Sequence, residues 1–271
     1  MDIPEKIDLM AKKNKARVGI GVGEPTKSLI SLAETAKEFA KVILIGDEEK
    51  IRKIGTNLEI INTKNPEEDL IKLLLSGKID AAVRGNLTSS KTLFWLKKEM
   101  NLDKIYRVAL LQTCSKNTFF LAPVGIDEGN TPSEKIEIIK RGRDLLKRFE
   151  IEAAVGILSG GRFGDFGRSD IVDKSLEEAE YVTKRVRKEK INAKNYQILI
   201  EDAVQKHRSN LIIAPDGISG NLIFRTLVFL GGGIGFGAPV LMDNKVFIDT
   251  SRASESYGRA IKFASALVTF D

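Results

Sequence analysis

The residues best suited to chemistry lie in a short turn near the C-terminus, Asp249-Thr250-Ser251-Arg252. An arginine such as Arg252 can hold a phosphate group through paired hydrogen bonds, and Asp249 could fix its guanidinium in place. A serine such as Ser251 can donate a hydrogen bond to an oxygen that becomes negative during a reaction. An acid-serine-arginine turn can equally form a surface ion pair, so this turn alone does not decide the chemistry.

A glycine turn further upstream carries a second pair of polar residues. Asp216 and Asn221 flank Gly217 and Gly220, between an apolar run and a helical pattern. Ligands of α/β proteins bind beyond the carboxyl ends of strands. We therefore expect Asp216 and Asn221 to line a binding site.

The loop Arg84–Lys91 places an arginine and three hydroxyl groups at the start of a predicted helix. Arg84, Thr88, Ser89 and Ser90 would form a cradle for a phosphate or carboxylate group. A helix simply capped by Ser89 or Ser90 is the alternative interpretation.

A glycine-rich loop, residues 159–170, follows another apolar strand. Its first four residues, Ser159, Gly160, Gly161 and Arg162, are candidate anion-binding groups. The loop lacks the Gly-Lys-Ser or Gly-Lys-Thr of a P-loop, which argues against an ATPase. An anion-binding lid is the favoured reading, and a linker is the alternative.

The first glycine cluster, Gly19-Ile20-Gly21-Val22-Gly23, alternates glycine with apolar residues. The pattern fails as a dinucleotide fingerprint, because Glu24 stands where the third glycine is needed. We interpret it mainly as a tightly packed strand. The turn that follows could still hold an anion at a helix start through backbone N–H groups and Lys27.

Composition excludes several classes of protein. The chain has 271 residues, with one cysteine and one histidine, so it can form neither an internal disulfide nor a Cys/His zinc site. We expect no metal. The charge of +6 comes from 43 basic and 37 acidic residues, which lie mostly in helix-like stretches, so we expect an anionic small molecule rather than nucleic acid. No signal peptide and no membrane span is visible, which predicts a cytoplasmic protein.

Apolar runs alternate with helical patterns along the chain, which predicts the α/β class with largely parallel sheets covered on both faces. Strands are expected at 17–22, 42–46, 58–61, 79–83, 108–111, 119–124, 153–159, 197–200, 211–214, 239–242 and 246–249. Helices are expected at 28–41, 66–76, 90–100, 133–149, 171–190, 219–230 and 254–268. The Gly- and Asn-containing segment 125–133 suggests a domain crossing. We predict one lobe from residues 1–128 with 246–271, and a second from 129–245.

Several motifs in shared order resemble the phosphate acetyltransferase and phosphate butyryltransferase family. They are Pro215-Asp216, Gly220-Asn221, Leu230-Gly231-Gly232, Gly237-Ala238-Pro239-Val240-Leu241 and Asp249-Thr250-Ser251-Arg252, with weaker matches at 44–51, 80–90 and 154–159. The resemblance covers nearly the whole chain. It implies a two-lobed α/β/α fold of the isocitrate and isopropylmalate dehydrogenase type, a homodimer, and a site in the interlobe cleft.

The reaction that this resemblance implies passes an acyl group between phosphate and coenzyme A. Arg252 would polarise the acyl carbonyl or bind phosphate, Ser251 would assist at the oxyanion, and Asn221 and Asp216 would line the cleft. The chain departs from the family at Gly258, where an aspartate is thought to act as the base, and at Thr88 and Arg84, which replace a histidine and a serine. Asp249 or Glu255 could substitute for the base.

These departures are similar to those of a divergent branch, the methanogenesis marker proteins of the MtxX type, which carry a methyltransferase label. Three functions remain open. The chain could be a phosphate acyltransferase-like enzyme that uses coenzyme A. It could be a methyltransferase of methanogenic one-carbon metabolism that uses S-adenosylmethionine or another methyl carrier. It could also be a non-catalytic regulatory protein that binds coenzyme A or a phosphate ester.

Overall fold

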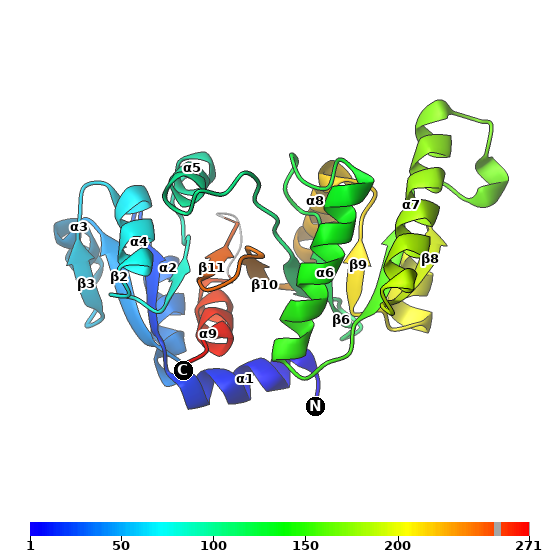
Figure 1. The fold of residues 1–271 in the computed structure, drawn as a ribbon. Helices are drawn as coiled ribbons and strands as arrows, with labels where there is room; N and C mark the ends of the chain where they lie inside the picture. The colour runs from blue at the N-terminus through cyan, green and yellow to red at the C-terminus, as the bar shows by residue number, and fades with distance from the viewer. Residues whose placement is uncertain (252–255, 271) are drawn as a thin grey trace. The chain divides into compact units, whose positions relative to one another are not determined.

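The computed structural model describes residues 1–251 and 256–270. Arg252 and Glu255, both considered above for catalysis, lie outside the described residues. The chain divides into two compact units. Unit 1 is Met1–Ile105 with Gly235–Asp271, and unit 2 is Tyr106–Ile234 (Figure 1).

Unit 1 is built on a sheet with the strand order β3-β2-β1-β4-β11-β10. All neighbouring pairs are parallel except β10 and β11, which are antiparallel. Its strands are β1 (Arg17–Gly21), β2 (Lys41–Gly46), β3 (Glu59–Asn62), β4 (Ala81–Val83), β10 (Ile234–Pro239) and β11 (Val246–Asp249). Its helices are α1 (Ile3–Asn14), α2 (Lys27–Glu34), η1 (Thr35–Glu38), α3 (Glu48–Ile54), α4 (Pro66–Leu75), α5 (Ser89–Glu99) and α9 (Tyr257–Leu267).

Local chemistry explains where several of these helices begin. Asp2 and Glu5 form a reciprocal capping box at the start of α1. Thr26 caps α2 and Asp47 caps α3, each through a hydrogen bond from a backbone N–H in the first turn. The apolar side chains of the central strands are fully buried, as Ile20 on β1 shows. These side chains form the core of unit 1.

The strands of unit 2 follow the order β5-β6-β9-β7-β8. β5 and β6 form an antiparallel hairpin, and the other neighbours are parallel. Its strands are β5 (Ala109–Gln112), β6 (Thr118–Ala122), β7 (Ala154–Leu158), β8 (Asn192–Gln197) and β9 (Leu211–Ile213). Its helices are α6 (Pro132–Arg148), η2 (Phe163–Asp165), α7 (Asp170–Lys188), η3 (Asp202–Lys206), α8 (Gly217–Arg225) and η4 (Thr226–Leu230).

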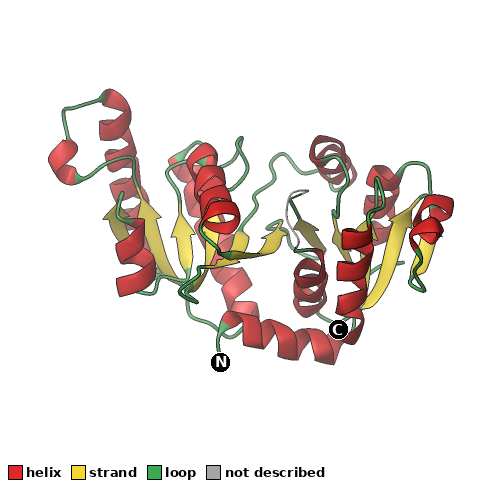
Figure 2. Ribbon diagram, turned by 180° about the vertical axis from the view of Figure 1, so that it is seen from behind, coloured by secondary structure: helices red, strands yellow, loops and turns green. Residues whose placement is uncertain are grey.

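Helices cover both faces of the unit 2 sheet. In Figure 1, α6 and α7 lie on the viewer's side and α8 lies behind; Figure 2 shows the unit from the α8 side. Gly142 lets α6 approach β9 closely, because a Cβ at this position would lie 2.8 Å from a methyl carbon of Leu211. These mostly parallel, helix-covered sheets confirm the predicted α/β class.

Two predicted strands differ from the structure. The strand expected at 197–200 is wrong, because the strand there is β8, Asn192–Gln197, whose polar residues conceal an edge strand. The strand expected at 239–242 begins earlier, as β10 at Ile234. Its two glycines lower the apolar signal on which the expectation depended.

The borders between the units also lie earlier in the chain than the predicted borders at 128 and 245. β6 pairs with β9, which places the β5–β6 hairpin in unit 2. β10 pairs with β11, which places residues 235–245 in unit 1. In the described ranges, no helix is both long and apolar enough to cross a membrane.

Candidate functional site

Three neighbouring strands of unit 1, β1, β4 and β11, run parallel to one another. Their carboxyl ends therefore lie at the same edge of the sheet, and the loop after each strand begins there. Ligands of α/β folds bind beyond this kind of edge. We take the three loops, which start at Val22, Arg84 and Thr250, as the candidate functional site of unit 1.

Asn86 joins the loop after β1 to the loop after β4. Its Oδ1 accepts a hydrogen bond from the backbone N–H of Gly23 at 2.8 Å, and its Nδ2 donates to the carbonyl oxygen of Glu24 at 2.5 Å. Asn86 lies in the loop that the sequence analysis selected, but it was not among the predicted site residues. In the sequence, Asn86 is only an asparagine in a turn, and nothing there indicates that it contacts the backbone of Gly23 and Glu24.

Arg84 and Asp249 join the loop after β4 to the end of β11. Both side chains are buried, and the guanidinium Nε of Arg84 donates to Oδ1 of Asp249. Nη1 of Arg84 donates to the carbonyl oxygen of Leu87 at 2.7 Å. The guanidinium predicted to bind an anion thus makes buried contacts within the protein.

Thr250 completes this junction. Its hydroxyl donates to the carbonyl oxygen of Gly85 at 2.8 Å, and its N–H donates to Oδ1 of Asp249 at 3.0 Å. The backbone that leads into Ser251 is therefore held by Asp249 and by Gly85. We had expected Asp249 to fix Arg252; within the described residues, it fixes Arg84 and Thr250.

The glycine cluster at the start of the chain is part of the strand packing. Gly19 and Gly21 belong to β1. A Cβ on Gly19 would lie 2.6 Å from a methyl carbon of Ile79, and one on Gly21 would lie 2.2 Å from a methyl carbon of Leu87. Gly85 has a φ of +64°, and a Cβ added to it would meet the carbonyl oxygen of Gly21. Gly19 and Gly21 are thus covered by neighbouring residues, as the strand interpretation requires, whereas Gly23 lies after the strand and is exposed.

The predicted hydroxyl groups of unit 1 lie at the same edge. Thr88 is the N-cap residue of α5 but makes no side-chain capping bond, and the helix begins at Ser89. The alternative in which Ser89 or Ser90 caps the helix is therefore wrong. Thr88, Ser89 and Ser251 are half-buried, whereas Ser90 and Lys27 are exposed.

Gly258, which replaces the base expected from the family, has no room for a side chain. It lies in the first turn of α9, and a Cβ there would lie 2.7 Å from the carbonyl oxygen of Leu32 and 2.6 Å from Oγ1 of Thr35. An aspartate at this position would force α9 away from α2 and η1. The close packing of these helices explains the glycine.

In unit 2, the glycine-rich loop follows β7 and is held by its own hydrogen bonds. The hydroxyl of the buried Ser159 donates to the carbonyl oxygen of Gly161 at 3.0 Å, and the N–H of Gly160 donates to Oγ of Ser175 at 2.8 Å. Three of the four candidates in this loop, Ser159, Gly160 and Gly161, therefore have structural partners.

The arginines of this loop differ in their surroundings. Nη1 of Arg168 contacts Oδ1 of Asp165 at 2.6 Å. Asp165 also accepts a hydrogen bond from the backbone N–H of Arg162, which, with Arg168, lowers the pKa of the carboxyl group. The Arg162 side chain is exposed. Arg162 is thus better placed than Arg168 to meet an anion.

Asp216 and Asn221 both hold backbone segments. Oδ1 of Asp216 accepts from the N–H of Ser219 at 2.8 Å and caps α8. Nδ2 of Asn221 donates to the carbonyl oxygen of Val124 at 2.9 Å. The bond from Asn221 attaches the start of α8 to the loop after β6.

Sequence reasoning missed an ion pair between Arg107 and the buried Glu128, which lies in that loop. Nε of Arg107 donates to Oε1 of Glu128 at 2.6 Å, and the backbone N–H of Arg107 donates to Oε2 at 2.9 Å. Burial raises the pKa of Glu128 even though Arg107 acts in the opposite direction. Glu128 lies in the segment 125–133, which the sequence analysis interprets as a domain crossing and not as part of an ion pair.

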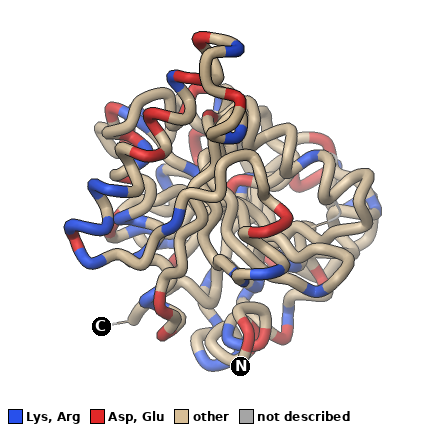
Figure 3. The backbone as a smooth tube through the Cα atoms, turned by 90° about the vertical axis from the view of Figure 1, so that its right-hand side faces the viewer, with Lys and Arg blue, Asp and Glu red and all other residues tan. Residues whose placement is uncertain are grey.

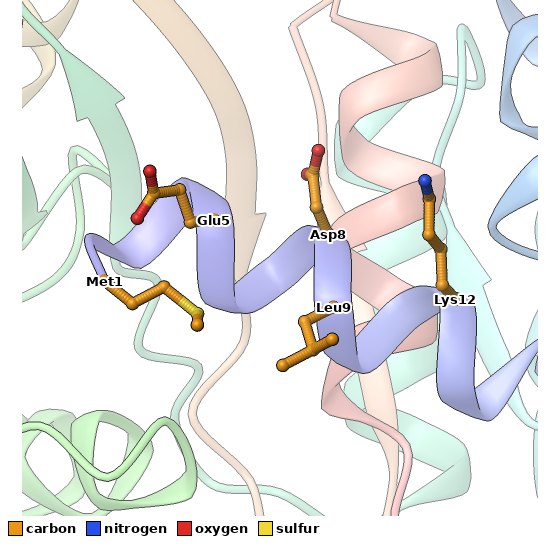
Figure 4. A pocket seen from close by; sticks show the side chains of 5 residues that line it. All are labelled: Met1, Glu5, Asp8, Leu9 and Lys12. Carbon is orange, nitrogen blue, oxygen red and sulfur yellow. The ribbon is translucent and has the colours of Figure 1, made fainter.

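A shallow hollow of about 550 Å³ lies along α1, lined by Met1, Glu5, Asp8, Leu9 and Lys12 (Figure 4). Its charged residues have partners: Glu5 is in the capping box, Asp8 pairs with Lys262, and Lys12 pairs with Glu38. No convergent polar group remains to orient a ligand, so we do not place the site here.

Charged residues of both signs are interspersed along the chain (Figure 3). In the basic run at the end of α7, Lys184 pairs with Glu180 at 3.3 Å and Arg185 pairs with Glu189 at 2.9 Å. The described residues contain no group of three or more His, Cys, Asp or Glu side chains that could hold a metal ion.

The comparison with known sequences identifies the family. The chain is 52% identical over 265 residues to a Methanosarcina mazei protein named "Putative methyltransferase mtx subunit X", covering 97% of this chain and 94% of the relative. The chain belongs to the MtxX family. An uncharacterized methyltransferase of Methanocaldococcus jannaschii is 42% identical, over 79% of this chain and 89% of that protein. No protein-family model matches the chain.

Solved structures with the same fold include two phosphotransacylases. A branched-chain phosphotransacylase from Enterococcus faecalis has a TM-score of 0.71 at 18% identity, over 94% of this chain and all (100%) of that chain. A phosphotransacetylase from Streptococcus pyogenes has a TM-score of 0.70 at 19% identity, over 99% of both chains. A 4-hydroxythreonine-4-phosphate dehydrogenase from Klebsiella pneumoniae has a TM-score of 0.63 at 11% identity, over 93% of this chain and 99% of that chain. These likenesses confirm the predicted phosphotransacetylase-like fold.

Proposed function

We propose that this MtxX protein is a phosphate acyltransferase-like enzyme of methanogens, which transfers an acyl group between phosphate and coenzyme A. The observation that carries the proposal is the junction of Arg84, Asp249 and Thr250, which holds the backbone directly before Ser251 at the carboxyl edge of the unit 1 sheet. A rigid support of this kind is what a hydrogen-bond donor needs if it is to stabilise a developing oxyanion.

The proposal gives each group one task. The thiol sulfur of coenzyme A attacks the carbonyl carbon of an acyl phosphate, the bond from that carbon to the phosphate oxygen breaks, and the thiol proton passes to solvent or to the released phosphate. Ser251 donates to the carbonyl oxygen, and Arg252 binds the phosphate or the carbonyl. Arg84 positions the Ser251 backbone rather than binding substrate. The N-terminus of α5, where Thr88 makes no side-chain capping bond, is proposed for a phosphate group.

The structure favours a reaction without a base at residue 258. Gly258 is closely packed, and Oδ1 of Asp249 already accepts from Arg84 and Thr250. A thiol with a pKa near 8.5 is ionised by a few per cent at neutral pH and is then a strong nucleophile. We therefore propose that orientation and charge stabilisation provide most of the rate.

The second candidate is a methyltransferase of methanogenic one-carbon metabolism, which the names of the relatives favour. Its support in the sequence is the glycine cluster, of which Gly19 and Gly21 lie within β1, where Ile79 and Leu87 fill the space beside them. A glycine-rich cofactor loop needs open space at the end of a strand for the phosphates or the nucleoside. We rank this candidate second and a non-catalytic coenzyme A-binding protein third.

The test is formation of acyl-coenzyme A from acetyl, butyryl or branched-chain acyl phosphate and coenzyme A. We expect wild-type turnover, and a fall in kcat of about 10²–10³-fold in Ser251→Ala, because one oxyanion donor is lost. Ser133→Ala is the matched control, since Ser133 is an exposed residue at the start of α6. Its kcat should match that of the wild type.

If no acyl phosphate gives acyl-coenzyme A, the proposal is wrong. Calorimetry with S-adenosylmethionine and with coenzyme A then separates the remaining candidates. Binding of S-adenosylmethionine alone supports a methyltransferase, and binding of coenzyme A without turnover supports the regulatory protein.

A further inference from the structure

Helix α5 carries a phenylalanine at the centre of its solvent-facing side. Thr92 and Leu96 are fully buried, and successive residues of a helix are turned by about 100° around its axis. Phe94 lies two residues from each of them, so it points away from the core of unit 1, and it is 58% exposed. The apolar residues of a surface helix usually face the core, and Phe94 departs from this pattern.

Three lysines flank Phe94 on the same side of α5. Lys91 and Lys98 lie within about 60° of Phe94 in one direction around the helix, and Lys97 lies about 60° away in the other direction. All three lysines are exposed. Glu99 is the only acidic residue of α5, and it lies about 140° from Phe94 around the helix. We call Phe94 with the three lysines the α5 basic face.

The positive charge of the α5 basic face is not compensated. Within residues 1–251 and 256–270, its three lysines make no ion pair, and the positions three and four residues away from each hold no acid. On α3, by contrast, Lys53 pairs with Glu49 at 2.9 Å. Nζ of Lys98 lies 4.4 Å from the centroid of the Trp95 ring, a contact that leaves its charge in place. The face is therefore complementary to an acidic surface.

We infer that the α5 basic face is a docking surface for an acidic protein. An apolar group of the partner would pack on Phe94, and carboxylates of the partner would meet the three lysines. An aromatic anchor near the centre, with polar and charged residues around it, is the usual arrangement of a protein–protein interface. Opposite charges also steer the two proteins together and fix their register.

Other occupants fit the α5 basic face less well. Affinity for nucleic acid comes largely from many phosphate contacts, and the face offers three cations. A helix that lies in a membrane interface buries a whole apolar side in lipid, and here the outer side has one large apolar residue. A second copy of this chain, placed on a two-fold axis, would bring the same lysines against each other, and like charges repel.

The α5 basic face begins next to the candidate functional site of unit 1. α5 follows the loop that starts at Arg84, and Lys91 lies in the first turn of the helix. Phe94 and Lys97 lie further along, so substitutions at these two positions test docking without changing the start of α5. The inference does not depend on the acyltransferase activity proposed above.

A defined probe tests the charge and the anchor together. The probe is a short synthetic helix of Glu, Ala and Leu, with leucines along one side and glutamates on both flanks. Trp95 is the single tryptophan of the chain and its ring centroid lies 5.5 Å from that of Phe94, so its fluorescence reports on binding. We expect saturable binding that weakens as salt is added, and no binding of the same peptide with Lys in place of Glu.

Two variants and two matched controls measure the contributions to this affinity. Phe94→Ala should raise the Kd by about 30-fold, the effect of losing an anchor residue, and Lys97→Glu should raise it by about tenfold. Leu9→Ala is the control for the first, because Leu9 on α1 is 60% exposed. Lys13→Glu is the control for the second, because Lys13 and Lys97 are both exposed in the last turn of a helix. Both controls should bind as the wild type does, and circular dichroism checks that all four variants are folded.

A photoreactive phenylalanine analogue at residue 94 identifies the natural partner. In a methanogen extract, it should join the full chain to an acidic protein, and the same group at residue 9 should not. That protein, once purified, should bind the wild type and both controls more tightly than Phe94→Ala and Lys97→Glu.

Several results would overturn the inference. They are a wild-type chain that does not bind the acidic peptide, a folded Lys97→Glu variant that binds it as tightly as Lys13→Glu, and displacement of the peptide by coenzyme A. A cross-link from residue 94 only to nucleic acid, to lipid, to a second copy or within the chain itself would also overturn it.

Discussion

At the scale of single residues, the carboxylate of Asp80 stabilises the fold by binding Arg17. Asp80 opens the segment that resembles the family's turn, and it accepts three hydrogen bonds from Arg17: from the backbone N at 2.7 Å, from Nε at 3.2 Å and from Nη2 at 2.5 Å. Burial acts to raise the pKa of Asp80, but the bonds from Arg17 outweigh burial and lower it. This pair fastens the start of β1 beside the start of β4.

The lowered pKa predicts how Asp80 contributes to stability against acid. A carboxyl group with a lower pKa in the folded state stabilises the fold above its unfolded pKa of about 3.9, and this contribution is lost as pH falls through the folded value. Asp80→Asn should lower the free energy of unfolding at neutral pH by about 1–3 kcal/mol. The loss of stability between neutral pH and about pH 3 should be smaller in the variant than in the wild type.

Urea unfolding at both pH values measures these differences. Glu49→Gln provides the control, because Glu49 is 83% exposed and pairs with the exposed Lys53; surface pairs of this kind contribute little. An Asp80→Asn variant as stable as Glu49→Gln at neutral pH would show that the bonds from Arg17 do not hold the two strands.

At the scale of elements, α8 depends on two glycines where the helix meets the loop after β6. A Cβ on Gly217 would lie 1.6 Å from the carbonyl oxygen of Gly125, and one on Gly220 would lie 1.9 Å from that of Pro123. Both obstacles are backbone atoms, which cannot rotate away as a side chain can. The Gly-Asn pair that resembles the family signature is therefore required for packing in this chain.

Gly220→Ala should destabilise the protein by about 2–4 kcal/mol, because the helix and the loop must separate. Gly164→Ala is the control: Gly164 also belongs to unit 2, and no atom lies within 4 Å of its expected Cβ. The urea midpoint measures both. Equal midpoints for the two variants would contradict the close approach seen between α8 and the loop.

The sequence predicts most of the elements but fewer of the contacts at the candidate site. Apolar strands such as β2 and β7 and amphipathic helices such as α6 follow from periodicity, because burial of one face determines both pattern and structure. β8 was missed because its residues are polar, and β10 was expected too late in the chain because glycines interrupt it. Strand pairing, not local pattern, creates these two elements.

The predicted site residues show a similar division. Motif order correctly directed attention to the carboxyl ends of strands, yet it could not show that Arg84 turns inward to Asp249 or that Asn221 holds Val124. Such contacts join residues far apart in sequence, and a polar residue after a strand has the same local pattern whether it binds a ligand or a neighbouring loop. Asn86 and Arg107 were missed for the same reason.

At the scale of the whole molecule, the chain passes twice from one unit to the other, after Ile105 and after Ile234. Each unit contains fully buried apolar residues on its own strands, such as Ile20 on β1 in unit 1 and Ile212 on β9 in unit 2. A unit with its own core can unfold by itself, and proteins built in this way commonly depart from two-state unfolding. When one unit unfolds, the two connecting segments stay covalently intact, and the other unit need not unfold.

The single tryptophan, Trp95, allows this to be measured, because it lies on α5 and reports on unit 1 alone. Ile212→Ala removes a fully buried side chain from unit 2 and should cost about 2–5 kcal/mol. We expect loss of helical circular dichroism to begin at lower urea in this variant, while the Trp95 fluorescence midpoint stays at the wild-type value. Ile20→Ala should shift the Trp95 midpoint instead. If both signals move together in both variants, the two units unfold as one.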